Sequence, residues 1–327
     1  MASIRAGEFD LIDQYFRPLA RSDAARNLSD DAAVLRPIDG HSFVVTVDTV
    51  TEGIHFLPNT NPEDIAQKAL RVNLSDLAAM AANPLGYTLA LSLSEEIDEP
   101  WLAAFTKGLK YDQDTFGLTL LGGDTTSTPG PVSLSITMFG QVLTGKAVPR
   151  SGAQIGDAIL VTGTIGDSAL GLLMETGQGP TLAADLRSAL VERYRRPVPR
   201  LGILATLNGR AHAAADISDG LIADAGHIAE ASGVKIQLEA DRVPMSNAAQ
   251  AALNADAALL ETILTGGDDY ELIFAVPPQD VAFTKNCGND SGVPITQIGQ
   301  VVAGSGVTVS GPSGRDLVFT RFGYQHR

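Results

Sequence analysis

Residues 117–124 read Gly-Leu-Thr-Leu-Leu-Gly-Gly-Asp, an apolar, strand-like run that leads directly into two glycines and an aspartate. Aspartates in short motifs of small residues recur along the chain, at Ser29-Asp30-Asp31, Val47-Asp48-Thr49, Leu74-Ser75-Asp76, Asp216-Ile217-Ser218-Asp219-Gly220 and Gly266-Gly267-Asp268-Asp269. Several stand where a strand is expected to end or a helix to start, and ligands of α/β folds collect at such ends. The pattern therefore predicts an α/β protein whose acidic side chains meet at one ligand site.

These aspartates favour a cation site over an ordinary solvated surface. A solvated face mixes Lys with Glu, whereas a carboxylate on the short Asp stem beside Gly or Ser suits a hard cation. Mg²⁺ takes oxygen ligands in octahedral geometry and usually shares them with substrate phosphates. Each motif alone is more often a turn or a helix cap. Their joint occurrence in both halves gives the hypothesis of a multi-Mg²⁺ site that handles a nucleotide.

Composition narrows the function classes. The 327 residues favour two domains, and the stretch 145–156 is the best linker, so we expect domains at 1–148 and 149–327. The net charge of −15 argues against binding of nucleic acid or of an anionic membrane surface. The single cysteine, Cys287, excludes an intramolecular disulfide and a cysteine-based zinc site. No stretch approaches the roughly 20 apolar residues of a membrane span, and a cytoplasmic protein is expected.

The clearest expected element is a helix over 62–82, which Asn61 can cap and Pro62 can begin. Asn73 and Asp76 share one face of it, and a carboxylate on a helix built to be buried needs a partner. Other expected elements of the first half are strands at 32–35, 42–47, 87–93, 117–121 and 132–142 and a helix over 99–112. The second half reads as α/β, with strands at 158–162, 234–238 and 271–276 and a helix over 219–231.

Two common nucleotide motifs are broken or missing in the sequence. Gly140 and Gly145-Lys146 have the spacing of a P-loop, but Ala147 replaces the hydroxyl that binds Mg²⁺, and Pro149 stands where a helix should run. No G-x-G-x-x-G opens a helix after a strand, so a Rossmann dinucleotide site is unsupported.

Three features have both a functional and a structural interpretation. Gly122-Gly123 lets backbone N–H groups approach a phosphate, or it makes a tight turn. Ser218 and Asp219 start an expected helix whose N-terminus attracts phosphate, or they are a plain cap. Arg150, just past the linker, reaches an anion or is an ordinary surface arginine.

Taken together, the motifs resemble the thiamine-monophosphate kinase family, in order and over nearly the whole chain. The resemblance is carried by Gly7-Glu8-Phe9, Thr46-Val47-Asp48-Thr49, Gly53-Ile54-His55-Phe56, Val72-Asn73-Leu74-Ser75-Asp76, Leu121-Gly122-Gly123-Asp124-Thr125-Thr126, Arg150-Ser151-Gly152-Ala153, Asp216-Ile217-Ser218-Asp219-Gly220-Leu221 and Gly266-Gly267-Asp268-Asp269-Tyr270-Glu271-Leu272. This family belongs to a group that is similar to aminoimidazole-ribonucleotide synthetase and selenophosphate synthetase. The resemblance implies an N-terminal mixed-sheet domain that pairs strands across a homodimer, a C-terminal α/β domain, and ATP bound in the cleft with several Mg²⁺. The implied reaction is phosphorylation of thiamine monophosphate by ATP, which gives thiamine diphosphate and ADP.

The resemblance also implies roles for individual residues. The implied Mg²⁺ ligands are Asp31, Thr46, Asp48, Asp76, Asp124, Asp216 and Asp219. The implied ATP contacts are Gly123, Asp124, Arg150, Ser218 and Phe116, the last where relatives tend to have Tyr. The implied contacts to thiamine monophosphate are His55, Asp268 and Tyr324. Relatives often carry Glu, one methylene longer, where Asp268 stands, and Asp269 is the alternative contact.

The expected mechanism needs no general base. The attacking phosphate is already ionised near pH 7, because its second pKa is about 6, and positioning and charge neutralisation do most of the work of phosphoryl transfer. Two other functions stay open: another ATP-dependent synthetase of the same superfamily, and a non-catalytic nucleotide- or metal-binding module. ADP formation that depends strictly on thiamine monophosphate separates the three.

Overall fold

Helix α2 (Pro62–Ala79) of the computed structural model begins and ends at the signals that the sequence carries. The Asn61 side chain accepts the backbone N–H of Glu63 at 3.1 Å, which satisfies one of the unpaired donors of the first turn. Just beyond the helix, Ala81 takes a positive φ of 55°, a conformation that reverses the chain at helix ends. The helix predicted over 62–82 is therefore confirmed.

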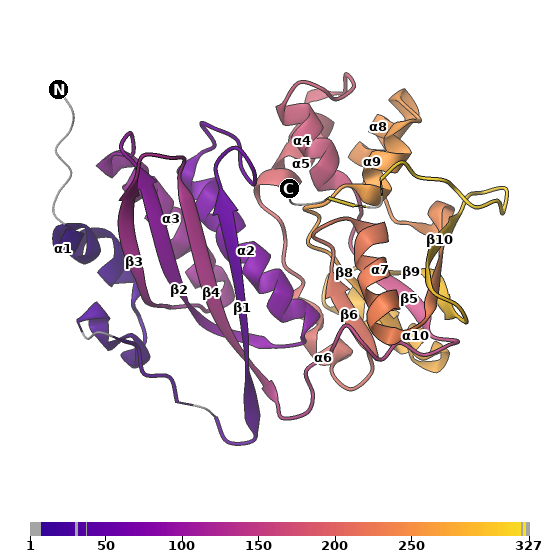
Figure 1. Cartoon of the computed structure of the whole chain (residues 1–327), viewed down its shortest axis with the longest axis horizontal. Helices are drawn as coiled ribbons and strands as arrows, with labels where there is room; N and C mark the ends of the chain where they lie inside the picture. The colour runs from indigo at the N-terminus through magenta and orange to yellow at the C-terminus, as the bar shows by residue number, and fades with distance from the viewer. Residues whose placement is uncertain (1–7, 30–31, 37, 322, 325–327) are drawn as a thin grey trace. The chain divides into compact units, whose positions relative to one another are not determined.

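The chain divides into two compact units (Figure 1), and the structure describes residues 8–29, 32–36, 38–321 and 323–324. The first unit comprises the described residues up to Leu77 together with Ala82–Gly145. The second comprises Ala78–Ala81 and the described residues from Lys146 onward. Among all these residues, no helix has both the length and the apolar character to cross a bilayer.

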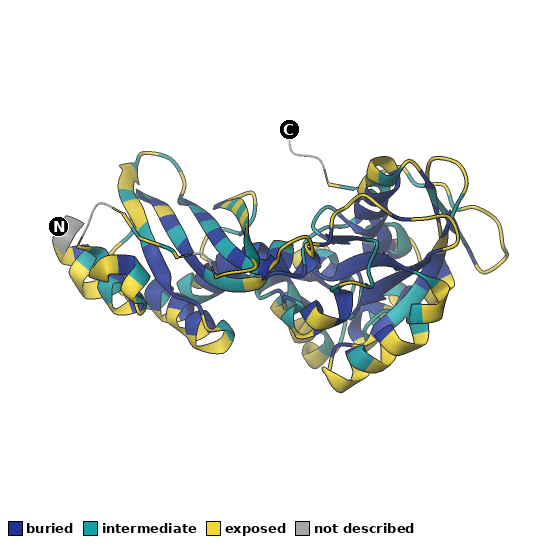
Figure 2. Ribbon diagram, turned by 90° about the horizontal axis from the view of Figure 1, so that it is seen from below, coloured by how far each residue is buried: buried dark blue, intermediate teal, exposed yellow. Residues whose placement is uncertain are grey.

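The first unit is a four-stranded mixed sheet with helices on one face (Figures 1 and 2). Its elements after α1 (Glu8–Leu11) and short helical turns are β1 (His41–Thr51), α2, β2 (Asn83–Ser94), α3 (Glu99–Phe116), β3 (Leu120–Thr128) and β4 (Ser133–Leu143). The strand order is β1-β4-β2-β3, with β2 and β3 parallel and the other neighbours antiparallel. The expected N-terminal mixed sheet is thus confirmed.

The strand predicted at 32–35 is wrong, because the described residues there are irregular. Strand β1 starts only at His41, directly opposite Leu143, the last residue of β4. The sheet therefore offers residues 32–35 no neighbouring strand with which to pair.

The two faces of β1 differ in what covers them. Every second residue faces α2, and these inward positions include Thr46 and Asp48. The alternate residues Phe43, Val45 and Val47 are 42%, 55% and 61% exposed on the outer face. Strand β1 is also an edge strand, so these exposed apolar side chains lie at one edge of the sheet.

The second unit is a six-stranded mixed sheet, in the order β10-β7-β9-β5-β8-β6, between two layers of helices. Its strands are β5 (Ala158–Thr162), β6 (Ala213–Asp216), β7 (Lys235–Glu239), β8 (Leu272–Val276), β9 (Ile295–Val302) and β10 (Gly306–Ser310). Its α-helices are α4 (Asp167–Glu175), α5 (Ala184–Arg195), α6 (Leu204–Leu207), α7 (Leu221–Ser232), α8 (Asn247–Ala255), α9 (Leu259–Thr265) and α10 (Val281–Asp290). The expected α/β character of the second half is confirmed.

Strand β8 shows why the middle of this sheet reads as a continuous apolar run. Ile273 and Ala275 pack into the core that α4, α5 and α7–α9 share. Phe274 packs into the opposite core, with α6 and residues 78–81. A strand covered on both faces gains from apolar residues at every position, so alternation disappears.

Candidate functional site

Two carboxylates and a hydroxyl that the resemblance names as Mg²⁺ ligands lie close together in the first unit. The Thr46 hydroxyl on β1 donates to Oδ2 of Asp76 on α2 at 2.5 Å. Burial, the nearby charge of Asp76 and a hydrogen bond to Asp76 raise the pKa of Asp48 to about 7. Carboxyl groups held this close either share a proton or gain from a cation between them. The all-oxygen donor set of these side chains fits Mg²⁺.

Asp48 and Asp124 lie inside strands, so the prediction that each ends a strand is wrong. Strand β1 continues past Asp48 to Thr51, and β3 continues past Asp124 to Thr128. The β-branched residues that follow both aspartates favour an extended backbone. The sequence motif marks these aspartates, but strand pairing decides where the strands stop.

Gly123 is required by a close approach of two strands, not by a turn. A Cβ atom at this position would lie 2.1 Å from the carbonyl oxygen of Leu89 on β2. The parallel pairing of β2 with β3 leaves no room there for a side chain. Both Gly123 and Asp124 are exposed to solvent at this point of the sheet.

A pocket of about 220 Å³ lies beside this glycine pair, entirely within the first unit. Apolar side chains and polar backbone and side-chain atoms both line it, from Ile12, Phe16, Ala25, Leu28, Ala32, Ala33, Leu89, Leu120, Leu121, Gly122, Gly123, Asp124 and Thr125. Phe116 is not among these described lining residues; the guanidinium of Arg71 lies 5.9 Å from the centre of its ring. A flat aromatic group would fit the apolar part of the pocket, with Asp124 at its polar side.

Two other predicted positions of the first half are Asp31 and His55. Asp31 lies outside the described residues. His55 follows β1 in a loop, half-buried, and its Nδ1 accepts the backbone N–H of Thr51 at 3.1 Å.

In the second unit, the motif 216–220 forms the connection from β6 to α7. Asp216 is the last residue of β6 and is buried, and Ser218 and Asp219 are partly exposed in the connecting turn. The helix begins only at Leu221, after Gly220 with a φ of 117°. Ser218 is therefore not its cap.

The backbone N–H groups of this turn are already taken by a side chain that the sequence analysis missed. Oδ2 of Asp224, on the first turn of α7, accepts the N–H groups of Ser218 and Asp219 at 3.1 Å and of Gly220 at 3.2 Å. An internal carboxylate therefore already accepts all three of these N–H groups, while the predicted phosphate contact of Ser218 stays a prediction. Burial, and then the charge of Asp219, raise the pKa of Asp224 to about 7, while these N–H groups and the charge of Arg150 act in the opposite direction.

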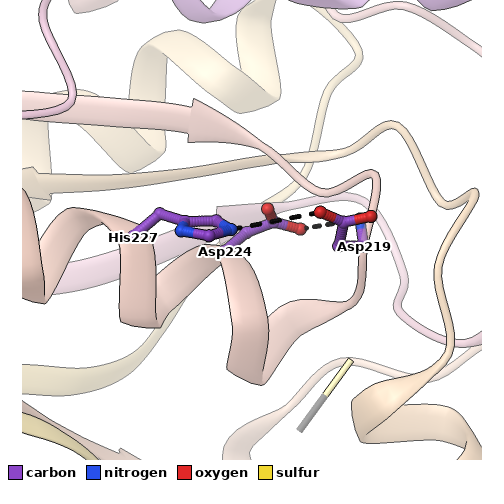
Figure 3. A group of neighbouring side chains, drawn as sticks. All are labelled: Asp219, Asp224 and His227. Atoms are coloured by element: carbon purple, nitrogen blue, oxygen red, sulfur yellow. Dashed lines mark hydrogen bonds and ion pairs between the residues drawn. The ribbon is translucent and has the colours of Figure 1, made fainter. Parts of the chain in front are cut away.

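Figure 3 shows Asp224 with its neighbours Asp219 and His227. One ligand atom from each of the three lies within 4.8 Å of the others, and Nε2 of His227 is 4.0 Å from Oδ2 of Asp219. Asp219 is the partly exposed carboxylate of the group, whereas Asp224 is buried. The donor set is compatible with a divalent cation at Asp219.

The Gly-Gly-Asp-Asp loop lies against the same turn. The backbone N–H of Asp268 donates to the carbonyl oxygen of Ser218, and that of Tyr270 to Ile217, both at 2.8 Å. Asp268 and Tyr270 have positive φ values of 70° and 51°, which side chains other than Gly adopt at a cost. The Tyr270 hydroxyl donates to Oδ1 of Asp268 at 3.2 Å. The structure thus holds the Asp268 carboxylate in one place beside the turn.

Asp269 points the other way and is buried. Its carboxylate accepts the backbone N–H groups of Gly166 at 2.6 Å and of Ser168 at 3.2 Å, at the start of α4. Burial raises its pKa well above the ordinary value despite these bonds. Asp269 anchors a helix and does not present its carboxylate as the alternative substrate contact.

The chain end brings Tyr324 to the turn. Its backbone N–H donates to the carbonyl oxygen of Asp219 at 2.9 Å, and the residue is 52% exposed. Upstream, Oε1 of Glu261 on α9 accepts three donors from Thr320 and Arg321 and secures the last segment. Tyr324, Asp219 and Asp268 are therefore gathered around one turn.

Sequence reasoning also missed a buried ionic group behind this loop. Glu271 is fully buried and pairs with Arg193 at 2.8 Å and with Arg200, while Thr162 donates to it at 2.6 Å. Neither Glu271 nor Asp224 has a local signal beyond an acid in an otherwise apolar stretch. That signal is a weak one, because such an acid becomes informative only when its partners are known.

The two units of the chain match the two domains of a known class of protein. Residues 29–142 match the model of the "AIR synthase related protein, N-terminal domain" and residues 154–311 that of the "AIR synthase related protein, C-terminal domain". Within this class, the chain belongs to the thiamine-monophosphate kinase family.

The relatives support this membership along the whole length. The thiamine-monophosphate kinase of Caulobacter vibrioides is 42% identical over 323 residues, which cover 98% of this chain and 90% of that protein. The crystal structure of the thiamine-monophosphate kinase from Stenotrophomonas maltophilia K279a is 42% identical, with a TM-score of 0.84 over 95% of this chain and 98% of that one. A structure of AaThiL complexed with AMPPCP and TMP is 31% identical, with a TM-score of 0.78 and full coverage of both chains.

Proposed function

We propose that this chain transfers the γ-phosphate of ATP directly to thiamine monophosphate, giving thiamine diphosphate and ADP, with Mg²⁺ as the cofactor. The family membership supports the two substrates, since one solved relative is complexed with AMPPCP and TMP. The observation that carries the metal requirement is the group of Thr46, Asp48 and Asp76, whose carboxyl groups repel each other unless a proton or a cation lies between them.

The proposed Mg²⁺ ligands come from both domains, which we place at 1–148 and 149–327. They are Asp31, Thr46, Asp48, Asp76, Asp124, Asp216 and Asp219. All are oxygen donors, as Mg²⁺ requires. Bound Mg²⁺ would neutralise phosphate charge and so let two anionic substrates approach each other.

For ATP we propose contacts with Gly123, Asp124, Arg150 and Ser218. The pocket beside Gly123 is the proposed site of the adenine base of ATP, since a flat aromatic ring can pack against the apolar side chains that line part of it. Phe116, outside that lining, stays a prediction. Arg150 is exposed and close enough to affect Asp224, so its charge is available to a phosphate at the turn.

For thiamine monophosphate we propose contacts with His55, Asp268 and Tyr324. The Tyr270 hydroxyl and two backbone hydrogen bonds hold Asp268, and the bond from Tyr324 to Asp219 holds the chain end. An oxygen of the substrate phosphate forms the new bond to the γ-phosphorus, and the bond from that phosphorus to the bridging oxygen of ADP breaks. The attacking oxygen is already ionised near neutral pH, so the chain's task is positioning.

We test this function by ³¹P NMR with ATP, Mg²⁺ and thiamine monophosphate. We expect thiamine diphosphate and ADP in equal amounts, and no ADP when thiamine monophosphate is left out. Asp124→Ala and Asp216→Ala should each abolish turnover while the circular dichroism spectrum stays native, whereas Asp39→Asn, a change at an exposed carboxylate, should leave turnover intact. Near-normal turnover in either alanine variant would contradict the proposed metal sites.

We also propose a homodimer through the outer face of the first unit. The edge strand β1 exposes the apolar side chains of Phe43, Val45 and Val47, and Phe139 of β4 lies opposite Val45. Such an edge is normally covered in a stable protein. We expect Val45→Lys to halve the molar mass in light scattering and the control Val318→Lys, at a 95% exposed position, to leave it unchanged. A Val45→Lys protein of unchanged mass would refute this interface.

A further inference from the structure

Asp224 is a buried carboxylate on an otherwise apolar face of helix α7. It lies 1% exposed on the first turn of α7, among the apolar residues Leu221, Ile222 and Ala225. A charged group in such surroundings carries a large desolvation cost unless hydrogen bonds repay it. Its presence at this position therefore needs a specific partner.

The partner is the turn that carries the proposed metal ligands. Oδ2 of Asp224 accepts the N–H groups of three successive residues, Ser218, Asp219 and Gly220, at 3.1–3.2 Å. Successive N–H groups that converge in this way form a concave site for an anion. In this molecule the anion is supplied by the chain itself, and Figure 3 shows it directed at Asp219.

This arrangement fixes the direction of the neighbouring side chains. Gly220 has a φ of 117°, and a Cβ atom there would lie 2.6 Å from the carbonyl oxygen of Thr265, so the turn is closely packed on its far side. With the N–H groups turned inward to Asp224, the side chain of Asp219 stays on the partly exposed side of the turn. Without that acceptor, one buried donor (Gly220) and two partly buried donors (Ser218 and Asp219) would lose their partner and the turn would rearrange.

We propose that Asp224 is a positioning residue for phosphoryl transfer: its carboxylate clamps three consecutive backbone N–H groups and thereby holds Ser218 and Asp219 ready for metal and nucleotide. The inference rests on the proposed function for its catalytic consequence, and on the three hydrogen bonds for its structural part. Asp224 itself does not touch the substrates.

The test compares Asp224→Asn and Asp224→Ala with the wild-type full-length chain. Asn keeps an oxygen acceptor without charge, and hydrogen bonds to a charged group are roughly twice as strong as neutral ones. Without ligand, amide exchange at 218–220 should become about tenfold faster with Asn and faster still with Ala. With substrates, kcat should fall about 10-fold with Asn and about 100-fold with Ala, and the half-saturating Mg²⁺ concentration should rise about 10-fold.

The matched control removes a capping carboxylate far from the turn in the sequence. Asp98 caps α3 by accepting the N–H of Trp101 at 2.9 Å. Asp98→Ala should lower thermal stability, since a lost cap destabilises a helix. It should leave kcat, the Mg²⁺ requirement and exchange at 218–220 unchanged. If Asp224→Ala does not fold, the Asn variant decides the test.

Three results would overturn the proposal. The first is native exchange at 218–220 in a folded Asp224 variant, because the clamp would then be unnecessary. The second is a raised half-saturating Mg²⁺ concentration together with wild-type amide exchange at 218–220, which would make Asp224 a metal ligand instead. The third is a loss of thermal stability with unchanged kcat and Mg²⁺ response, which is a purely structural role. A wild-type chain without kinase activity would instead refute the proposed function, and the exchange data, which need no substrate, would still decide whether the clamp exists.

Discussion

Replacing Asp48 by Asn should make the metal-free protein more stable near pH 8 while it removes activity. Burial, the charge of Asp76 and their hydrogen bond raise the pKa of Asp48 from the ordinary 3.8 to about 7. Since one pKa unit corresponds to about 1.4 kcal/mol, ionising this carboxyl in the folded state costs about 4 kcal/mol more than in water. Part of that cost belongs to Asp76 and part is screened by water, so we expect Asn to recover about 1–3 kcal/mol.

The effect should depend on pH in one direction. Between about pH 4 and pH 7 the folded protein keeps a proton on Asp48 that the unfolded chain has lost. The free energy of unfolding of the wild type therefore decreases as pH rises through this window, because the folded state binds more protons. The Asn variant lacks this titrating group. The free energies of unfolding of the two proteins should therefore be similar near pH 4.5 and differ most near pH 8.

Trp101 is the chain's only tryptophan and lies on α3, in the same unit as Asp48, which makes its fluorescence a local reporter of unfolding. We would measure urea unfolding with EDTA at pH 4.5 and pH 8, with Asp39→Asn as the charge-matched control. Adding Mg²⁺ should stabilise the wild type more than the Asp48→Asn variant, because only the wild type keeps both carboxylates. An Asn variant that is no more stable than the wild type at pH 8, or equally stabilised at both pH values, would refute the reasoning.

Three further predictions concern the second unit. Glu271→Ala leaves two arginines, which are only 14% and 17% exposed, without their carboxylate and should lower the free energy of unfolding by about 3–5 kcal/mol in thermal or urea melts; a loss below 1 kcal/mol would contradict this. Gly267→Ala places a Cβ atom 2.1 Å from the carbonyl oxygen of Ser218, so the KM for thiamine monophosphate should rise, and an unchanged KM would show that the loop adapts. The Glu261 carboxylate accepts hydrogen bonds from Thr320 that lower its pKa, so these contacts should persist above its ordinary pKa of 4.5 and be lost as pH falls through the lower folded value; an NMR titration midpoint at or above 4.5 would contradict them.

Much of the fold could be predicted because its signals are local. Helix α2 carries its own cap, its first-turn proline and its apolar stripe, and the strands of the second unit appear as short apolar runs between turn residues. The prediction of a strand at 32–35 was wrong because a strand exists only where a neighbouring strand pairs with it. Strand β4 ends opposite His41 and so does not reach these residues. Strand existence is a property of two segments, which a single run of residues does not encode.

The sequence by itself determined the family and the α/β character of the two halves, and it supplies the prediction of which aspartates bind metal, since these follow from residue types in short, ordered motifs. Only the tertiary structure decided what each carboxylate does. It directs Asp224 to three N–H groups of a neighbouring turn and Asp269 to the start of α4, and it leaves Asp48 beside Asp76. The reason is physical: the state of a carboxylate depends on the donors, charges and water within a few ångströms, and these come from segments that are far apart in the chain.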